Sequence, residues 1–530
     1  MRRPIGPMRV TLQTHRRRIL AWVIPLMALL TIVAPSYSST YPRLDQREHL
    51  ISSMGSNAAT RLLYGPLPEP GTIGQLVTWE MGTYLVIATA VLALLLGVSF
   101  GRGAEDTGTA ELVQACGYRA SSRLGAAAGA VATVTVGLGA AVAAVLLVET
   151  AFVDELSWQG ALGLGAVTAC CGLFFGFAGL LAGELADSAG LARLLGFVAL
   201  AAAFGIRAIA NVQDISPLRW FSPLGWIDAE APYTHDRWWA LLIFVAVCAL
   251  IGLLVWWAGR NREYASAPLH ARASSADRLR IRSVLALTWR LERGRWLAWT
   301  VIVTAVAALF GGMSGSLIDL LTSDESTAKL MRQLTGERQL DAVFFSFAGV
   351  MIGLLVGCYA VLTMLGDATA EADGTMENLL TVGARGRSPL LARIVVAAAG
   401  SLAMLLVAGG VGSLVALTQL PGGAGRCFSY IAGQWPAELA LIGITGLVIG
   451  VHRRWGPVAW LPVAGSGVLV LMGSVLHAPD WLEHAGVFAH VPSYADGSAP
   501  STGVFGLLAC FVAAATVGGW RRAQRDVEPD

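Results

Sequence analysis

Apolar residues in this chain occur in long stretches that are separated by shorter polar segments. Because the hydrocarbon core of a bilayer is about 30 Å thick, a helix needs roughly 20 mostly apolar residues to cross it. The pattern therefore predicts an all-α polytopic membrane protein with about twelve transmembrane helices. The predicted spans cover approximately residues 19–36, 76–100, 124–148, 159–183, 190–211, 237–258, 296–316, 341–365, 389–416, 434–452, 457–477 and 501–520.

The first stretch also has the features of a signal peptide. Three arginines at 16–18 precede it, and Ala34-Pro35-Ser36 offers a weak cleavage site. Its apolar length and the further spans that follow favour a membrane span instead.

Composition supports the membrane interpretation and excludes other classes of protein. Of 530 residues, 55% are hydrophobic and 14% are charged, whereas a soluble domain has roughly 25% charged residues. A soluble enzyme, a disordered chain and a secreted disulfide scaffold are therefore excluded. The net charge of +2 gives no electrostatic sign of nucleic-acid binding.

The distribution of basic residues predicts the orientation in a bacterial plasma membrane. With the N-terminus inside, 27 of the 37 basic residues lie at the inner ends of the predicted spans. Basic residues concentrate on the cytoplasmic side of membrane proteins. Both termini are therefore expected in the cytoplasm.

One basic residue bears on the energy source. Lys329 is the only lysine, and it follows Ser-Thr-Ala without a glycine-rich turn. A Walker-type phosphate loop ends such a turn in Lys-Ser or Lys-Thr. The chain is therefore not expected to hydrolyse ATP, and no catalytic residue is assigned to it.

Two inner loops repeat one another in sequence. Between residues 105–124 and residues 371–390, eight of twenty positions are identical without a gap. The repeat divides the chain into a first six-span half at 1–258, a cytoplasmic linker at 259–295 and a second six-span half at 296–530. The halves are parallel repeats, since each starts on the inner side.

Each repeated loop is predicted to hold a short, two-turn helix. Threonine and aspartate can cap a helix start, a carboxylate in the first turn suits the helix dipole, and glycine can end the helix in a left-handed conformation. The residues in these roles are Thr107 or Thr109, Glu111 and Gly117 in the first loop, and Asp373 or Thr375, Glu377 and Gly383 in the second. The alternative is a solvated loop in which these residues only cap the ends of a short helix and carry no further function.

A basic segment precedes each half. Residues 8–18 lead into Leu20-Ala21-Trp22, and the end of the linker leads into Leu297-Ala298-Trp299. Both segments are predicted to form amphipathic helices at the inner membrane surface, with tryptophan as the anchor. The alternative is a simple stop-transfer flank.

Two long outer loops contain aromatic, proline-punctuated segments that fit partial re-entry into the outer interface and an outer gate. An aromatic belt with no gating role is the alternative. The candidate outer-gate residues are Trp220, Phe221, Pro223, Trp226, Trp481 and Phe488.

In these features the chain resembles the ABC-2-type permeases, and specifically the fused twelve-span permeases of actinobacterial polyketide-antibiotic and multidrug exporters, the tetronasin-exporter type. The resemblance rests on residues 65–71 and 74–79, the two repeated loops, the segment 220–226 and Trp238-Trp239. It extends over nearly the whole chain. The second half departs from the pattern, because Gly486-Val487 stands where Ser-Pro is expected.

The resemblance implies an ATP-driven exporter of the type V architecture that moves hydrophobic or amphipathic compounds, such as antibiotics and drugs, by alternating access. Two copies of a separately encoded ATPase would dock on the cytoplasmic face and hold ATP and magnesium, and this chain would bind no cofactor. The repeated loops would be the coupling helices. Their candidate coupling residues are Glu105, Thr109, Glu111, Arg119, Glu371, Thr375, Glu377 and Arg385.

The resemblance also implies that the second and fifth spans of each half line the substrate pathway. Glu80 and Arg207 either pair with each other or reach to the outer surface. The phenylalanines near 345 either grip an amphipathic substrate or pack in the core. The candidate pathway residues are Thr78, Trp79, Glu80, Tyr84, Arg207, Phe344, Phe345 and Phe347.

Other classes of function fit less well. A twelve-span secondary transporter driven by an ion gradient shares the span count, but it usually has short outer loops and inverted repeats. A membrane enzyme acting on lipids would need convergent acidic or histidine residues, and none are evident. His477, His484 and His490 lack the spacing of metal ligands, so no metal site is expected.

Overall fold

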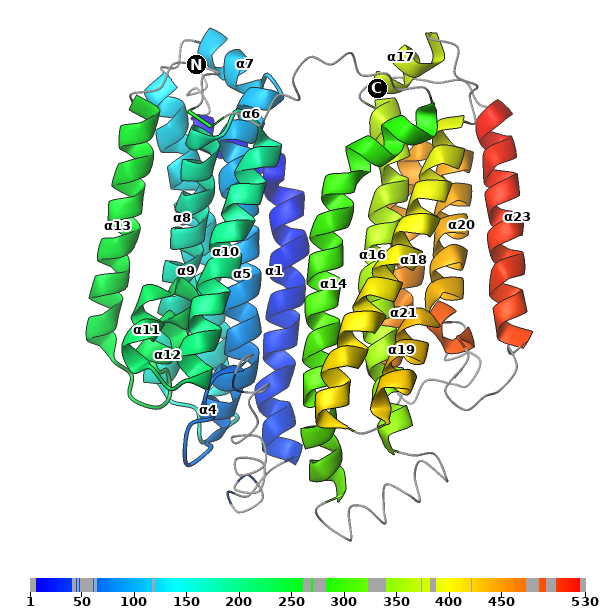
Figure 1. The fold of residues 1–530 in the computed structure, drawn as a ribbon. Coiled ribbons are helices and arrows are strands. Elements are labelled where there is room, and N and C mark those ends of the chain that lie inside the picture. The colour runs from blue at the N-terminus through cyan, green and yellow to red at the C-terminus, as the bar shows by residue number, and fades with distance from the viewer. Residues whose placement is uncertain are drawn as a thin grey trace. The chain divides into compact units, whose positions relative to one another are not determined.

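In the part of the chain that it describes, the computed structural model is built from helices (Figure 1). The described residues are 6–40, 44, 47, 61, 64–116, 120–260, 268–269, 283–322, 340–372, 374–381, 388–420, 422–472, 486–491 and 502–524. The chain divides into two compact units, unit 1 at Met1–Asp277 and unit 2 at Arg278–Asp530. Each unit is described by itself.

Unit 1 is built from long helices and short connecting helices. Its elements are α1 (Pro7–Thr40), α4 (Ile73–Val77), the π-helix η1 (Thr78–Gly82), α5 (Thr83–Phe100), α6 (Arg102–Asp106), α7 (Thr109–Ala115), α8 (Ala120–Glu149), α9 (Trp158–Leu185), α10 (Ala189–Val212), α11 (Ser216–Phe221), the 3₁₀-helix η2 (Pro223–Gly225), α12 (Trp226–Glu230) and α13 (Trp238–Arg260). The short helices α6 and α7 lie at one end of this unit, and α11 and α12 lie at the other (Figure 1).

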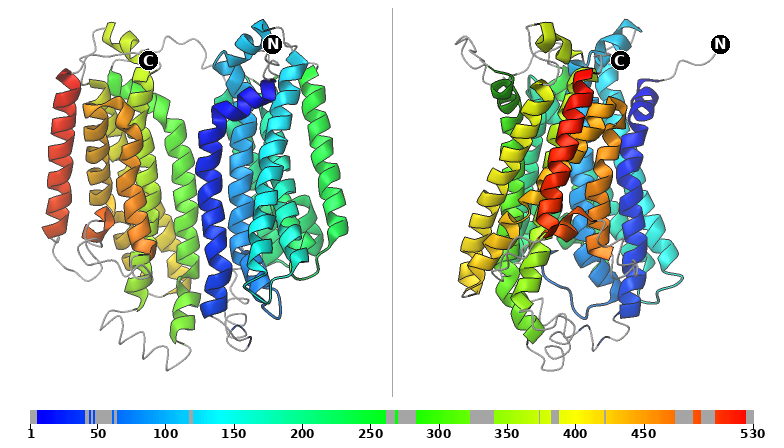
Figure 2. Two further views of the ribbon diagram at one scale, coloured as in Figure 1. Left: turned by 180° about the vertical axis from the view of Figure 1, so that it is seen from behind. Right: turned by 90° about the vertical axis from the view of Figure 1, so that its right-hand side faces the viewer.

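Unit 2 has a similar order of elements. They are α14 (Val284–Thr322), α16 (Leu340–Ala372), α17 (Thr375–Thr381), α18 (Ser388–Gln419), α19 (Gly423–Ala432), α20 (Trp435–Val451), the 3₁₀-helix η3 (Arg453–Trp460), α21 (Leu461–Met472), the 3₁₀-helix η4 (Val487–His490) and α23 (Thr502–Gln524). The short helix α17 lies at one end of this unit, and α21 and η4 lie toward the other (Figures 1 and 2).

Within the described part of the chain, eleven helices are long and apolar enough to cross a membrane. They correspond to eleven of the twelve predicted spans and confirm an all-α polytopic membrane protein. The twelfth prediction, 457–477, falls on η3 and α21. Since α21 ends at Met472 and residues 473–485 lie outside the described residues, this span is described only in part.

The two basic segments predicted to lie at the membrane surface are continuous with the spans that follow them. Helix α1 already begins at Pro7 and α14 at Val284. No proline separates either basic segment from its apolar stretch, so the helical hydrogen bonding is not interrupted. Figure 2 shows that α1 bends near its start, so its first turns run across the end of unit 1.

Helix α9 packs in the middle of unit 1, and glycines allow the close approach of its neighbours. A β-carbon at Gly97 of α5 would overlap the carbonyl oxygen of Gly176 of α9. In the same way, Gly139 of α8 faces Gly165 of α9. Small residues of this kind allow helix backbones to come together in a membrane. Gly137, by contrast, faces open space.

We expect Gly97→Ala to destabilise the protein by about 1–3 kcal/mol, because overpacked helices must move apart. Thermal unfolding of the detergent-purified chain measures the effect. Gly137→Ala is the matched control, and its melting temperature should equal or slightly exceed that of the wild type, because alanine favours the helix. Equal losses in both variants would contradict the packing explanation.

Candidate functional site

The loop between α5 and α8 forms a defined short helix, α7. Gly108 precedes it in the left-handed conformation, with φ of +72°. Its N–H donates to the carbonyl oxygen of Glu105 at 3.0 Å, and the N–H of Glu111 donates to the carbonyl oxygen of Gly108 at 3.1 Å. Thr109 Oγ1 donates to the carbonyl oxygen of Ala104 at 3.0 Å. Glycine adopts this backbone conformation without the cost of a β-carbon.

Unit 2 repeats this geometry bond for bond in α17. Gly374 has φ of +70°, and its N–H donates to the carbonyl oxygen of Glu371 at 3.2 Å. The N–H of Glu377 donates to the carbonyl oxygen of Gly374 at 3.3 Å, and Thr375 Oγ1 donates to the carbonyl oxygen of Ala370 at 2.9 Å. The duplicated residues therefore encode a duplicated backbone.

The short helices confirm the prediction of a two-turn helix in each loop, but the conformational roles within them differ. Gly108 and Gly374, which precede the helices, hold the left-handed conformation. The left-handed conformation was predicted for Gly117 and Gly383, and these two residues lie outside the described residues. The hydroxyl of Thr109 binds a carbonyl ahead of the helix instead of capping an amide.

One face of each short helix is directed away from its unit. Ala110 of α7 and Met376 of α17 are buried at equivalent positions. Glu111 and Glu377, which follow them, are exposed, and Leu112 is 69% exposed. An acidic surface is thus presented at the end of each unit, and in unit 1 this surface is also partly apolar.

Glu105 and Glu371, the other repeated acids, point into their units. The carboxylate of Glu105 contacts Arg102 at 3.1 Å and Arg123 at 2.6 Å. That of Glu371 contacts Arg522 at 3.3 Å, and its side chain is 1% exposed. These two acids therefore anchor the loops to the spans. The predicted coupling residues Arg119 and Arg385 lie outside the described residues.

The anchored loop of unit 1 is also connected to a neighbouring span. Asp106 Oδ2 accepts a hydrogen bond from the backbone N–H of Ala189 at 2.7 Å, at the start of α10. Arg102, besides its carboxylate partners, donates to the carbonyl oxygen of Asp187. A displacement of α6 and α7 would therefore act on the first turn of α10.

At the opposite end of unit 1, Arg207 is buried and fully paired. Its Nε lies 2.7 Å from Asp228 Oδ2, and its Nη2 donates to Thr83 Oγ1 at 3.1 Å and to the carbonyl oxygen of Tyr64 at 3.2 Å. Glu80 accepts instead from the hydroxyl of Tyr37. The suggested pair of Glu80 and Arg207 is therefore not formed, because α12 folds back and brings Asp228 to the arginine.

The other candidate pathway residues of unit 1 line the same end. Trp79 is buried, and its Nε1 donates to the carbonyl oxygen of Gly65 at 3.0 Å. Thr78 is also buried. Tyr84 is 42% exposed and lies 2.6 Å from Tyr64 between the hydroxyl oxygens. Among these residues, Tyr84 alone presents a substantially exposed side chain.

The phenylalanines of unit 2 divide between core and surface. Phe344 and Phe345 are buried, whereas Phe347 is 43% exposed. Phe310 of α14 makes edge contacts with both Phe344 and Phe347. Of the two interpretations, packing in the core applies to Phe344 and Phe345 and not to Phe347.

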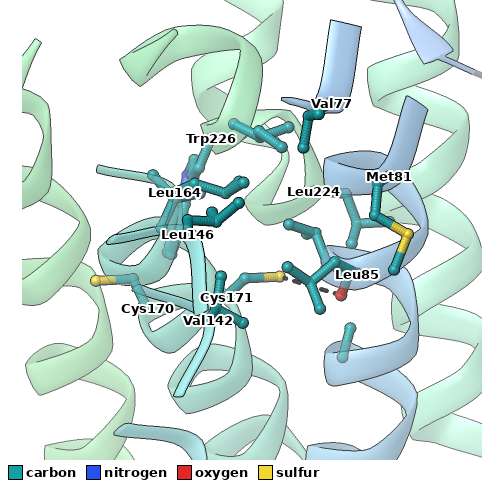
Figure 3. Close-up of a cluster of buried hydrophobic side chains, with 14 of the residues drawn as sticks. Val77, Met81, Leu85, Val142, Leu146, Leu164, Cys170, Cys171, Leu224 and Trp226 are labelled. Carbon is teal, nitrogen blue, oxygen red and sulfur yellow. Dashed lines mark hydrogen bonds between the residues drawn. The ribbon is translucent and has the colours of Figure 1, made fainter. Parts of the chain in front are cut away.

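The aromatic segment before α13 folds into unit 1. Trp226 stacks on Phe244 with ring centroids 4.5 Å apart, and Trp220 stacks on Trp239 at 5.2 Å. Figure 3 shows Trp226 and Leu224 in the same cluster of buried side chains as Val77, Met81 and Leu85. The segment therefore packs against the helices of unit 1, and its partial re-entry into the outer membrane interface stays a prediction.

The remaining candidate gate residues differ in exposure. Pro223 is buried, whereas Phe221 is 78% exposed. In unit 2, Phe488 of η4 is buried against Gly353. Trp481 lies outside the described residues.

A group of buried polar side chains, which the sequence did not indicate, lies near α12. Glu230 has a fully buried side chain, and neither carboxylate oxygen has a hydrogen-bond partner among the described residues. Burial, and then repulsion by Asp236, raises the pKa of Glu230 to about 7. Burial and the nearby Glu149 carboxylate likewise raise the pKa of Tyr233. Only the unusual density of Glu, Asp and Tyr in this loop could have drawn attention to it.

We expect Arg207→Ala to destabilise unit 1 by about 3–5 kcal/mol, because Asp228 would be left without its buried cation. The double variant R207A/D228A should lose less than the sum of the two single losses, since neither charge is stranded. Thermal unfolding of the purified variants gives the comparison. Arg237→Ala, an exposed arginine of the same unit, should stay within about 1 kcal/mol of the wild type. Additive losses in the double variant would contradict the pairing.

The buried Glu230 predicts a dependence of stability on pH. An unfolded glutamate has a pKa of about 4.3, so the raised value favours the protonated folded state. Its contribution is complete below about pH 4.3 and is lost as pH rises to about 7, by roughly 3 kcal/mol between pH 5 and 8. Glu230→Gln should remove this part of the pH dependence of the melting temperature. Asp154→Asn, which neutralises an exposed acid between α8 and α9, should retain it. An unchanged pH profile in Glu230→Gln would contradict this assignment.

Comparisons with known proteins bear on both units. Residues 281–521 match the family model described as "Multidrug efflux system permease Rv1217c, C-terminal domain". The chain is 28% identical to the multidrug efflux system permease protein Rv1217c of Mycobacterium tuberculosis over 532 aligned residues. The alignment covers 99% of this chain and 95% of that protein. The chain is therefore a polytopic membrane protein that is homologous, through both of its units, to a multidrug efflux permease.

Proposed function

We propose that this chain is the membrane-spanning subunit of an ATP-driven exporter of hydrophobic or amphipathic compounds, of the ABC-2 type and the tetronasin-exporter subtype. The observation that carries the proposal is the pair of short helices α7 and α17. They have the same length, the same left-handed glycine and the same hydrogen bonds. A pair of equivalent surfaces suits a motor that has two equivalent halves.

The two short helices are built to transmit displacement. Each is fixed to its unit by a buried ion pair, through Glu105 in unit 1 and Glu371 in unit 2. Each presents an exposed glutamate on its outer face, Glu111 or Glu377. A partner that binds the exposed face and moves would carry the anchored spans with it, which supports alternating access driven from this end.

ATP and magnesium would be held by the partner subunits. The only lysine, Lys329, has no glycine-rich turn before it, and a phosphate loop requires both. The chain itself therefore acts as a transport subunit and not as an enzyme. Two copies of the ATPase would occupy α7 and α17.

The same proposal covers the orientation of the chain in the membrane and the class of compounds that it transports. Basic residues concentrate at the ends that carry α7 and α17, and this supports a cytoplasmic position for these ends and for both termini. The relative is named as a multidrug efflux permease, and the exposed aromatic side chains of Tyr84 and Phe347 suit apolar and amphipathic compounds.

The proposal predicts that charge reversal on the exposed faces uncouples the transporter. The chain is co-expressed with an ATP-binding-cassette ATPase, and vanadate-sensitive efflux of ethidium from vesicles is measured. Glu111→Arg or Glu377→Arg should reduce efflux about tenfold or more, because a reversed charge at a docking surface costs several kcal/mol. Asp154→Arg is the matched control, since it reverses an exposed acid outside both short helices, and it should retain efflux.

Two outcomes would contradict the proposal. Efflux that persists without any ATPase and follows an imposed proton gradient would indicate a secondary transporter. Equal loss of efflux in Asp154→Arg would show that charge reversal acts through general damage and not through docking.

A further inference from the structure

A cavity of about 540 Å³ lies in unit 1 beside α7. The first turns of α1 form one wall, α6 and α7 form another, and the beginnings of α8 and α10 complete it. These elements meet at the same end of unit 1 (Figure 1). The cavity is separate from the candidate pathway residues, which lie toward the other end.

The polar side chains that line this cavity favour an anion. Arg123, Arg193 and His15 line it, and none of the described lining residues is acidic. One edge of the Arg123 guanidinium binds Glu105, at 2.6 Å from Nη2, but its Nε is buried and has no hydrogen-bond partner in the described part of the chain. Five hydroxyl groups also line the cavity, from Thr11, Thr14, Ser99, Thr107 and Thr109.

A third arginine, Arg18, lies next to the cavity without lining it. Its Nη1 donates to the hydroxyl oxygen of the lining residue Ser99 at 3.3 Å, and the Arg193 guanidinium is close enough to repel that of Arg18. Neither arginine forms an ion pair within the described ranges. Both side chains are exposed, so solvent screens part of their repulsion, and an anion between them would relieve the rest.

In unit 2, a carboxylate of the protein itself stands where the proposed anion would be needed in unit 1. The sequence Arg-x-Leu-Ala-Trp begins at Arg18 in unit 1 and at Arg295 in unit 2. Three residues before Arg295 lies Glu292, whose carboxylate contacts Arg295 at 2.7 Å and Arg393 at 2.9 Å. Three residues before Arg18 lies His15. Unit 1 thus keeps the arginine but lacks the carboxylate.

Apolar groups complete the wall beside these charges. Phe100 is buried and makes an edge contact with His15, with ring centroids 5.0 Å apart. Val10, Ala126 and Ala127 also line the cavity. A cationic pocket with an apolar wall, at the start of a membrane span, fits a phosphate head group whose acyl chains enter the bilayer.

We propose that this cavity binds the phosphate group of an anionic phospholipid, which supplies a negative charge to Arg18 and Arg193 as Glu292 supplies one to Arg295 and Arg393 in unit 2. Thr107, Thr109 and Leu112 share the cavity wall, so an occupied cavity braces α7 against its unit. The site does not depend on the proposed transport mechanism. A free phosphate ion has the same recognition chemistry, and the experiment below separates the two sources.

The test uses the full chain, purified in neutral detergent and freed of lipid, with thermal unfolding followed at fixed ionic strength. Phosphatidylglycerol, phosphatidylcholine and inorganic phosphate are added separately. Phosphatidylglycerol should raise the melting temperature, and phosphatidylcholine should not. The double variant R18Q/R193Q should need about tenfold or more phosphatidylglycerol for the same effect, because charged hydrogen bonds to the phosphate are lost.

Matched variants keep the result specific. R16Q/R17Q removes two exposed charges from α1 that do not line the cavity, and its apparent affinity should stay within about twofold of the wild type. His15→Glu should raise the melting temperature without lipid and abolish the response to phosphatidylglycerol, because the protein then carries its own anion.

The outcomes are distinct. Stabilisation by phosphatidylglycerol alone identifies the lipid, and equal, arginine-dependent stabilisation by inorganic phosphate supports the phosphate site with the free ion as its source. The proposal is overturned if phosphatidylcholine stabilises equally, if R16Q/R17Q weakens the response as much as R18Q/R193Q, or if neither phosphate source stabilises the wild type.

Discussion

The pairing of buried arginines with carboxylates fixes the segments that connect the spans. A charge removed from water is costly unless it is paired and hydrogen-bonded. At the α12 end of unit 1, packing also contributes, because Leu224 and Trp226 belong to the buried core. The ion pairs add to this packing. Glu105 ties α6 and α7 to Arg123 of α8, and Asp228 ties the α12 region to Arg207 of α10. Since each partner comes from a different element, satisfying the charge also sets the position of the loop.

The two units reach the same short helix through different anchors. In unit 1, Glu105 is bound by Arg102 of its own helix, α6, and by Arg123 of α8. In unit 2, Arg522 of the last helix, α23, binds Glu371. The backbone of α7 and α17 is duplicated, but the cation that holds it is not. The duplicated part is therefore the surface that each helix presents, which is the part that two identical partners would have to recognise.

Sequence patterns predicted the features that depend on local order. Apolar length predicted eleven spans that the structure describes, and the repeat predicted α7 and α17. Contacts between distant residues could not be predicted in this way. Asp228 lies 21 residues after Arg207, and nothing in the pattern indicates that α12 folds back to reach it. The left-handed role of Gly108 was also missed, because a glycine before a threonine equally suits the first turn of a helix.

The two units differ in one charged position, which is Glu292 in unit 2 and His15 in unit 1. This difference bears on how firmly α7 and α17 are held. In unit 2, Glu292 satisfies Arg295 and Arg393 from within the protein, so α14 and α18 are joined whatever surrounds them. In unit 1, His15 occupies the corresponding place, so Arg18 has no such carboxylate three residues before it. Arg123 connects the proposed lipid site to the loop, because it both lines the cavity and binds Glu105. An anionic lipid in the proposed site would therefore act on α7 and leave α17 unaffected.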